Sequence, residues 1–257
     1  MLSPMQSTKV YMISFDWQFA YSWSRVEHPY QSLLTTGYMG DCLAYFDFTG
    51  LNPQAASPVG WFEHLSSAKR LLTLSNPAPS FTGAGLSLGR GMSASIQCQT
   101  PRAKPLQSWT LISWVRINNL DSQSAGAALS LLCGETFDAL VFGGKTPGKW
   151  MSGSECSHRT VYSDVGASGY VQQVALVFDG DKRTLDLFID GALAQSRSVI
   201  YQLNAIAKPI AHEVLINFGW REAYEGCFEG YVLAAEIYGR AMSLDQLVER
   251  DGIYANR

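Results

Sequence analysis

The chain has 257 residues, of which 47% are hydrophobic, 12% aromatic and only 16% charged, a composition typical of a globular, strand-rich protein and not of a disordered one. Its net charge is -3, from 22 acidic and 19 basic residues, and the absence of a basic run argues against a nucleic-acid partner. The sequence has neither a long apolar run nor a basic start followed by an apolar segment, so we expect no membrane insertion and see no signal peptide.

The first 38 residues show a regular alternation of side chains. Large apolar residues occupy every second position from Tyr11 to Trp23 and mostly polar ones lie between them, which indicates an extended chain. Two interpretations are open: the row packs its aromatic face onto the main core, or it docks on a neighbouring subunit. We predict an N-terminal arm over 1–38 and a separate domain over 39–257, with docking contacts from Tyr11, Phe15, Trp17, Phe19, Tyr21 and Trp23.

Short strands are predicted along the next hundred residues. Alternating or β-branched segments favour strands at 42–48, 86–88, 93–99, 109–117, 127–132 and 139–142. We leave residues 61–74 unassigned, because prolines on both sides limit a helix there. Residues 145–158 are predicted to form a loop that carries Trp150.

The stretch 170–199 has the clearest pattern in the chain. Two Asp-Gly pairs, Asp179-Gly180 and Asp190-Gly191, separate three extended segments. Because Asp and Gly tolerate the positive φ that a primed turn requires, both pairs predict tight hairpins. The apolar positions on one side of the first two segments are Val174, Leu176, Phe178, Leu185, Leu187 and Ile189. We therefore expect three neighbouring antiparallel strands that serve as scaffold.

The C-terminal part combines two strands with one helix. Strands are predicted on either side of a loop, at 214–218 and 228–238 with the loop at 219–226. Ser243 and Gln246 have capping-box spacing, and Gly252 stands where a helix would stop. Many short strands and one short C-terminal helix predict an all-β fold, an antiparallel β-sandwich of jelly-roll type.

Several sequence segments match segments of a known family and occur in the same order. These are Leu43–Phe48, Gly85–Gly89, Trp109–Val115, Val174–Gly180, Leu187–Gly191, Phe228–Tyr231 and Ile237–Ser243. Together, over about residues 39–250, they resemble the laminin-G-like jelly roll of the wider concanavalin A-like lectin/glucanase superfamily. The chain departs from that pattern at Leu233-Ala234, where the group often has Asp-Glu, and at Val171–Gln173, where a Trp-His pair commonly opens the central strand.

Three enzymatic patterns receive little support from the sequence. The glucanase branch holds its carboxylates at Glu-x-Asp-x-x-Glu spacing, which this sequence lacks. Gly85–Gly89 matches Gly-x-Ser-x-Gly, but a β segment follows it where a hydrolase elbow needs a helix. The histidines lack the spacing of zinc ligands and stand at His28, His64, His158 and His212. We predict no catalytic residues, with a divergent polysaccharide-cleaving enzyme as an alternative.

A binding site is predicted in loops that carry aromatic side chains. Trp220, Arg221 and Tyr224 in one loop, and Trp150 in another, supply the aromatic platform and the planar polar groups that a glycan site needs. The competing interpretation is that each Trp covers the end of the sandwich. Metal binding is less supported, but the resembled group often holds calcium at a loop rim, and its ligands here would be Asp138, Asp164 and Glu225.

The cysteines leave the redox chemistry open. They stand at positions 42, 98, 133, 156 and 227, an odd number without a Cys-x-x-Cys pair, which argues against structural zinc. We expect free thiols in strands, with one or two disulfides as the alternative.

These features together favour a non-enzymatic recognition or assembly module that acts on an extracellular or virion surface. The virion, phage-like role rests on the surface use of the resembled fold combined with the missing signal peptide. The alternative is a secreted, lectin-like carbohydrate-binding domain. Expected partners are glycans, other protein subunits of an assembly, or further copies of the chain.

Overall fold

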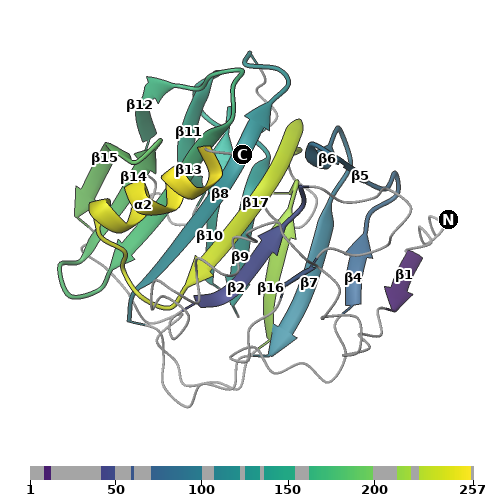
Figure 1. Cartoon of the computed structure of the whole chain (residues 1–257), viewed down its shortest axis with the longest axis horizontal. Coiled ribbons are helices and arrows are strands. Elements are labelled where there is room, and N and C mark those ends of the chain that lie inside the picture. The colour runs from purple at the N-terminus through teal and green to yellow at the C-terminus, as the bar shows by residue number, and fades with distance from the viewer. Residues whose placement is uncertain are drawn as a thin grey trace, which may run out of the picture.

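The protein forms a sandwich of two antiparallel sheets (Figure 1). The computed structural model describes residues 9–12, 42–49, 59–60, 71–99, 107–121, 125–133, 136–153, 162–198, 213–220 and 226–255. The predicted jelly-roll β-sandwich with a C-terminal helix is confirmed.

The 9-stranded sheet, called sheet B here, lies under the C-terminal helix. Its main path runs β15 (Ala192–Ser198), β14 (Thr184–Ile189), β13 (Gln172–Asp179), β8 (Trp109–Ile117), β17 (Gly230–Tyr238), β2 (Cys42–Asp47) and β3 (Val59–Gly60). Beside this path, β6 (Gly85–Leu88) pairs with β17 and with β5 (Ser80–Thr82).

The 8-stranded sheet, called sheet A, forms the other layer. Its order is β1 (Lys9–Met12), β4 (Leu71–Leu74), β7 (Ala94–Gln99), β16 (Glu213–Phe218), β9 (Ala127–Cys133), β10 (Thr136–Phe142), β11 (Lys149–Gly153) and β12 (Tyr162–Gly166). Leu71–Leu74, in the stretch left unassigned from the sequence, pairs with β7 on one side and β1 on the other.

The main core lies between the two sheets. The inward positions of the central strands are filled by the apolar residues that alternation predicted, with Val174, Leu176 and Phe178 of β13 beside Leu185, Leu187 and Ile189 of β14. Aromatic rings extend this core, as in Trp109 stacked on Phe178 with centroids 4.2 Å apart. A second cluster lies on the outer face of sheet B, beneath helix α2 (Leu244–Ala255).

Helix α2 begins at the predicted capping box. The Gln246 amide donates to Ser243 Oγ at 3.4 Å, and the Ser243 amide donates to Gln246 Oε1 at 2.9 Å. The predicted stop at Gly252 is wrong, because α2 continues to Ala255 and Gly252 does not adopt a positive φ. The last turn is retained because Tyr254 packs into the cluster beneath the helix.

The two Asp-Gly pairs behave differently. Asp190 and Gly191 have φ of 50° and 67°, so the predicted primed turn joins β14 to β15. The first pair does not form such a turn: β13 ends at Asp179, and four residues follow before Thr184, with Arg183 at φ 55°. Asp179 instead accepts hydrogen bonds from the amides of Asp181 and Lys182, both at 3.1 Å, which closes the wider loop.

Candidate functional site

The large apolar side chains that the described residues leave exposed fall into two groups. One group, Leu120, Tyr170 and Val171, belongs to loops at the end of the sandwich where β8 ends, uppermost in Figure 1. Tyr170 is 83% exposed. The other group, Leu193, Leu244 and Val248, lies by helix α2. Since single exposed apolar residues are ordinary but clusters indicate interaction surfaces, we take the loop end as the candidate site and call it the rim.

Backbone hydrogen bonds join the rim loops into one unit. The Ala167 amide donates to Gly148 O at 2.9 Å, and a Cβ on Gly148 would lie 3.2 Å from Leu120 O. The Asn118 amide donates to Glu229 O at 3.2 Å, and the Phe228 amide donates to Gly219 O at 2.7 Å. This chain of contacts links the loops before Tyr170, after β8 and after β16.

The loop that presents Tyr170 is fixed by side chains of its own hairpin. The Ser168 amide donates to Gln172 Oε1 at 2.9 Å, and the Tyr170 amide donates to Ser168 Oγ at 3.2 Å. Asp190 Oδ1 accepts from the Gln173 amide at 2.8 Å. These bonds fix the backbone at Tyr170, and the Tyr170 ring is exposed to solvent.

Trp220 lies at the same end. It follows β16, outside any strand and half-buried, and Gly219 before it donates to Ala127 O at 2.8 Å. Next to Ala127, Gly126 lets the chain at Phe228 pass close by, since a Cβ on Gly126 would lie 1.7 Å from the Phe228 nitrogen. The predicted loop placement of Trp220 is confirmed, whereas Arg221 and Tyr224 lie outside the described residues.

A cation-π pair extends the rim onto the outer face of sheet B. Arg116 of β8 and Tyr231 of β17 are opposite one another in the ladder, and the guanidinium carbon lies 4.5 Å from the ring centroid. The register that pairs Gln172 with Val115 places Val171 beside Arg116. Val171 and this pair therefore lie side by side on the outer face of sheet B, and Tyr170 directly precedes Val171 in the chain.

The predicted loop position of Trp150 is wrong. Trp150 lies in β11 opposite Phe142, is fully buried, and packs in the main core against Phe142 and Phe228. Its ring is closed to any ligand, because it serves as core. This segment is a strand because it pairs with β10 and β12, and its local sequence does not predict that pairing.

The predicted calcium ligands are not brought together by the described structure. Asp138 lies in strand β10 and is fully buried, and Asp164 lies in strand β12, so neither is a loop residue as expected. Glu225 is outside the described residues. Within the described ranges, no three His, Cys, Asp or Glu side chains are grouped as metal ligands.

The aromatic arm is described only in part. Tyr11 lies in β1, which pairs with β4 at the margin of sheet A. The other predicted docking residues lie outside the described residues and are Phe15, Trp17, Phe19, Tyr21 and Trp23. The choice between core strand and docking arm stays a prediction.

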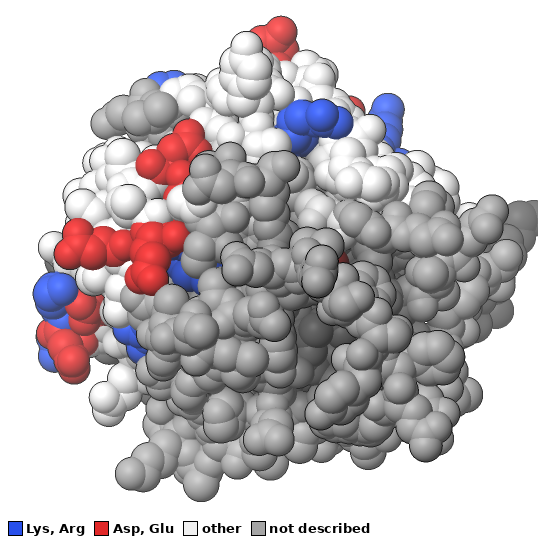
Figure 2. All heavy atoms as spheres, in the orientation of Figure 1, with Lys and Arg blue, Asp and Glu red and all other residues white. Residues whose placement is uncertain are grey.

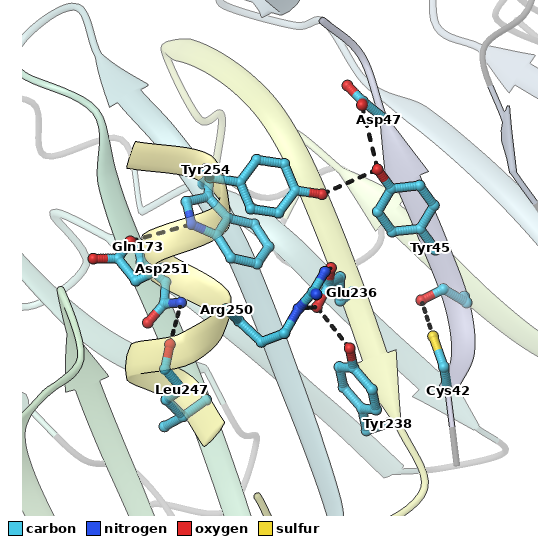
Figure 3. Close-up of polar contacts among 12 residues, drawn as sticks. Cys42, Tyr45, Asp47, Gln173, Glu236, Tyr238, Leu247, Arg250, Asp251 and Tyr254 are labelled. Carbon is cyan, nitrogen blue, oxygen red and sulfur yellow. Dashed lines mark hydrogen bonds and ion pairs between the residues drawn. The ribbon is translucent and has the colours of Figure 1, made fainter. Parts of the chain in front are cut away.

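A cluster of buried ionisable groups lies under helix α2 (Figure 3). Arg250 is fully buried and donates from both Nε and Nη2 to Glu236 on β17, with Nε to Oε2 at 3.0 Å. Tyr238 Oη donates to the same Oε2 at 2.8 Å. Burial opposes the charge of Arg250, but the Glu236 carboxylate outweighs it, and the pKa of Arg250 is raised.

The remaining groups of this cluster are shifted for related reasons. Burial, followed by the negative charge of Glu236, raises the pKa of Tyr238, Tyr254 and Cys42 well above their ordinary values. Tyr254 Oη donates to Tyr45 Oη at 3.1 Å. Shifted pKa values often mark functional sites, but a cluster with a fully buried ion pair cannot contact a ligand, so we assign it to fixing α2 on the sheet.

Ser87 likewise has a structural position. It lies within β6, between the core residues Leu86 and Leu88, and the next strand is β7. The strand-turn-helix context of a hydrolase nucleophile is not found around it.

This architecture defines the class: a jelly-roll sandwich with the exposed ring of Tyr170 in the loops at one end. A family model described as the concanavalin A-like lectin/glucanases superfamily matches residues 90–248, and the chain belongs to that superfamily. The comparison with curated proteins found no match.

Solved structures with the same fold are distant in sequence. The receptor binding domain of botulinum neurotoxin D is 10% identical, with a TM-score of 0.61 over 84% of this chain and 54% of that one. A structure of botulinum neurotoxin type C is 9% identical (TM-score 0.57; 85% and 52%), and Trypanosoma rangeli sialidase 13% (TM-score 0.55; 82% and 32%). The chain thus spans about half of the neurotoxin structures and a third of the sialidase.

Sequence reasoning missed Tyr170, Leu120 and the Arg116–Tyr231 pair. Tyr170 directly precedes a predicted strand, where an aromatic residue is ordinarily counted as core. Its one warning signal was the Ser-Gly before it, which is typical of a turn. The cross-strand pair depends on the register of β8 and β17, which local patterns do not give.

Proposed function

We propose that the chain is a non-catalytic recognition module that binds glycans through the rim, outside the cell. The observation that carries this proposal is Tyr170, a ring that is 83% exposed on a loop held by hydrogen bonds. A flat apolar ring facing solvent can stack on the apolar face of a sugar. Because the loop is already ordered, little conformational entropy is lost on binding.

The neighbouring groups suit the same ligand. Val171, next in the chain, and Leu120, in a loop at the same end, are exposed apolar side chains, and Arg116 beside Val171 supplies planar hydrogen-bond donors. Trp220 adds an indole at the same end of the sandwich. This combination of platform and donors is that of a typical small-ligand surface.

The comparisons support a binding role without defining the ligand. One similar structure is a receptor binding domain, and another belongs to a neurotoxin whose cell entry is dependent upon interaction with two ganglioside molecules. The sialidase keeps a glycan-cleaving alternative in view. Among the described residues no helix is long and apolar enough to cross a bilayer.

The test is a glycan array probed with the wild-type chain, with and without calcium. We expect binding to a restricted set of glycans, weakened about tenfold by Tyr170→Ala, since a stacked ring contributes about 0.5–1.5 kcal/mol beyond the area it buries and about 1.4 kcal/mol is tenfold in affinity. Trp220→Ala should weaken binding as well, whereas Leu193→Ser, away from the rim, should not.

Two outcomes would count against the proposal. Binding that survives both Tyr170→Ala and Trp220→Ala would remove the rim as the site. If chromatography detects sugars released from a bound glycan, the chain is an enzyme and the binding role is wrong.

A further inference from the structure

The second exposed apolar group forms one surface where helix α2 meets the β14–β15 turn. Leu244 and Val248 are 47% and 51% exposed and lie one turn apart on α2. Val248 touches the turn, since a Cβ on Gly191 would lie 2.8 Å from Val248 Cγ2. Leu193 is 54% exposed and opposite Phe188, which faces α2, so Leu193 is on the helix side of the sheet.

The helix cannot rotate to bury these residues. Its inner face is fixed by the Glu236–Arg250 pair, and Gln173 Nε2 donates to Leu247 O at 3.0 Å. Trp114 Nε1 donates to Asp251 Oδ1 at 3.3 Å, and the Tyr254 ring lies 3.9 Å from the Trp114 ring. Leu244 and Val248 are therefore presented to solvent by a rigid element.

Acidic side chains surround this surface. Asp245 and Glu249 are exposed on α2, Asp190 is exposed in the adjoining turn, and Asp186 shares the helix side of β14 with Phe188. The basic residue of the helix, Arg250, is buried and neutralised by Glu236. Figure 2 shows Asp and Glu side chains at the left of the face, with some Lys and Arg side chains beside them, where Figure 1 has α2 and the β14–β15 hairpin.

Two further observations agree with a negative surface. Burial and then the charge of Asp190 raise the pKa of Asp251. Of the bases around this surface, Arg240 near the start of α2 donates to Gln246 Oε1 at 2.9 Å. Arg197 of β15 is opposite Leu185, whose side chain faces the core and not the helix. Lys182 and Arg183 lie in the turn at the opposite end of β14, where Lys182 is paired with Asp179 at 2.9 Å.

We propose that this face, made of Leu193, Leu244, Val248 and the acids around them, docks a segment of a partner protein that carries apolar side chains flanked by Lys or Arg. The apolar groups would cover the three exposed residues, and the bases would meet Asp190, Asp245 and Glu249. A second copy in the same pose is disfavoured, because acids would face acids. This proposal is independent of glycan binding at the rim.

The partner is held by side chains and not by strand addition. β15 has β14 as its partner, but the register between them shifts at Leu187/Phe188. Such a bulge twists an edge strand and makes it a poor template for a further strand.

The test selects random peptides displayed on phage against the wild-type chain. We expect the enriched peptides to combine apolar residues with Lys or Arg. Synthetic copies should bind about tenfold more weakly to the Leu244→Ser/Val248→Ser variant. Binding should also weaken with added salt and with Asp245→Lys. The matched control, Leu120→Ser/Val171→Ser at the rim, should bind like wild type.

Three results would overturn the proposal: no enriched peptide, enriched peptides without basic residues, or equal binding to the Leu244→Ser/Val248→Ser variant. A wild-type dimer in sedimentation equilibrium that this variant abolishes would assign the face to a second copy instead. Thermal unfolding of every variant identifies misfolding, and Asp245→Lys, an exposed change, keeps the test valid if the double variant fails to fold.

Discussion

At the scale of single residues, the most costly arrangement is the ion pair between Glu236 and Arg250. Both side chains are fully buried, so each has lost its hydration, and the pair is tolerable only because the guanidinium binds both carboxylate oxygens while Tyr238 donates to one of them. Removing one partner leaves the other charge buried and unpaired.

We therefore expect Glu236→Gln to reduce the free energy of unfolding by about 3–5 kcal/mol, with a similar loss for Arg250→Met. The double variant should lose less than the sum of the two, because no charge then remains unpaired. Urea denaturation of the four proteins measures this. Additive losses would show that the two groups do not depend on each other.

At the scale of elements, α2 is a case where tertiary contacts outweigh a local stop signal. Gly252 is exposed, has no positive φ, and a Cβ there would have nothing within 4 Å. The residue is a weak point within the helix, because glycine has more freedom than alanine in the unfolded chain.

Gly252→Ala should therefore raise the free energy of unfolding by about 0.5–1 kcal/mol. A helix that ended at Gly252 would instead be destabilised by the same change. Thermal unfolding separates the two, with Ser243→Ala as a control that should lose about 1 kcal/mol by removing the cap.

Gly126→Ala, where a Cβ would lie 1.7 Å from the Phe228 nitrogen, should be strongly destabilising.

The elements also show which parts of the fold are encoded locally. The faces of β13 and β14 follow from alternation, and the Asp190-Gly191 turn follows from residues that tolerate positive φ. β11 could not be predicted in the same way, since its five residues become a strand by pairing with β10 and β12. The local sequence therefore predicts a loop at Trp150, whereas the folded chain places its ring in the core.

At the scale of the whole molecule, the candidate site could be predicted only in part. The sequence predicts a loop at Trp220. That Trp220 and Tyr170 lie at the same end of the sandwich, however, results from hydrogen bonds among loops distant in sequence.

The cysteines also depend on long-range order. Cys98 and Cys133 both face Val214, from opposite sides of β16. Their Cα atoms are thus two strand spacings apart, about 10 Å, too far for a disulfide.

The buried tyrosines give the whole molecule a defined alkaline limit. The pKa of Tyr238, Tyr254 and Cys42 is raised in the folded chain by burial and by Glu236, while the ordinary values are 10.0 and 9.0. Above those values the unfolded chain releases protons that the folded chain retains. Stability from these groups is therefore fully present below about pH 9 and falls as the pH rises further.

We expect the free energy of unfolding in urea to fall between about pH 9.5 and 11, by up to about 1.4 kcal/mol per pH unit for each such group. Tyr254→Phe keeps the ring against Trp114 but removes one ionisable group, so its decline should be shallower by about one proton. The difference in tyrosinate absorbance between the wild-type chain, which has 12 tyrosines, and Tyr254→Phe should show the ionisation of Tyr254 only upon unfolding. An equally steep decline in Tyr254→Phe, or early ionisation, would mean that water reaches the base of α2 and that the helix is not rigidly closed over sheet B.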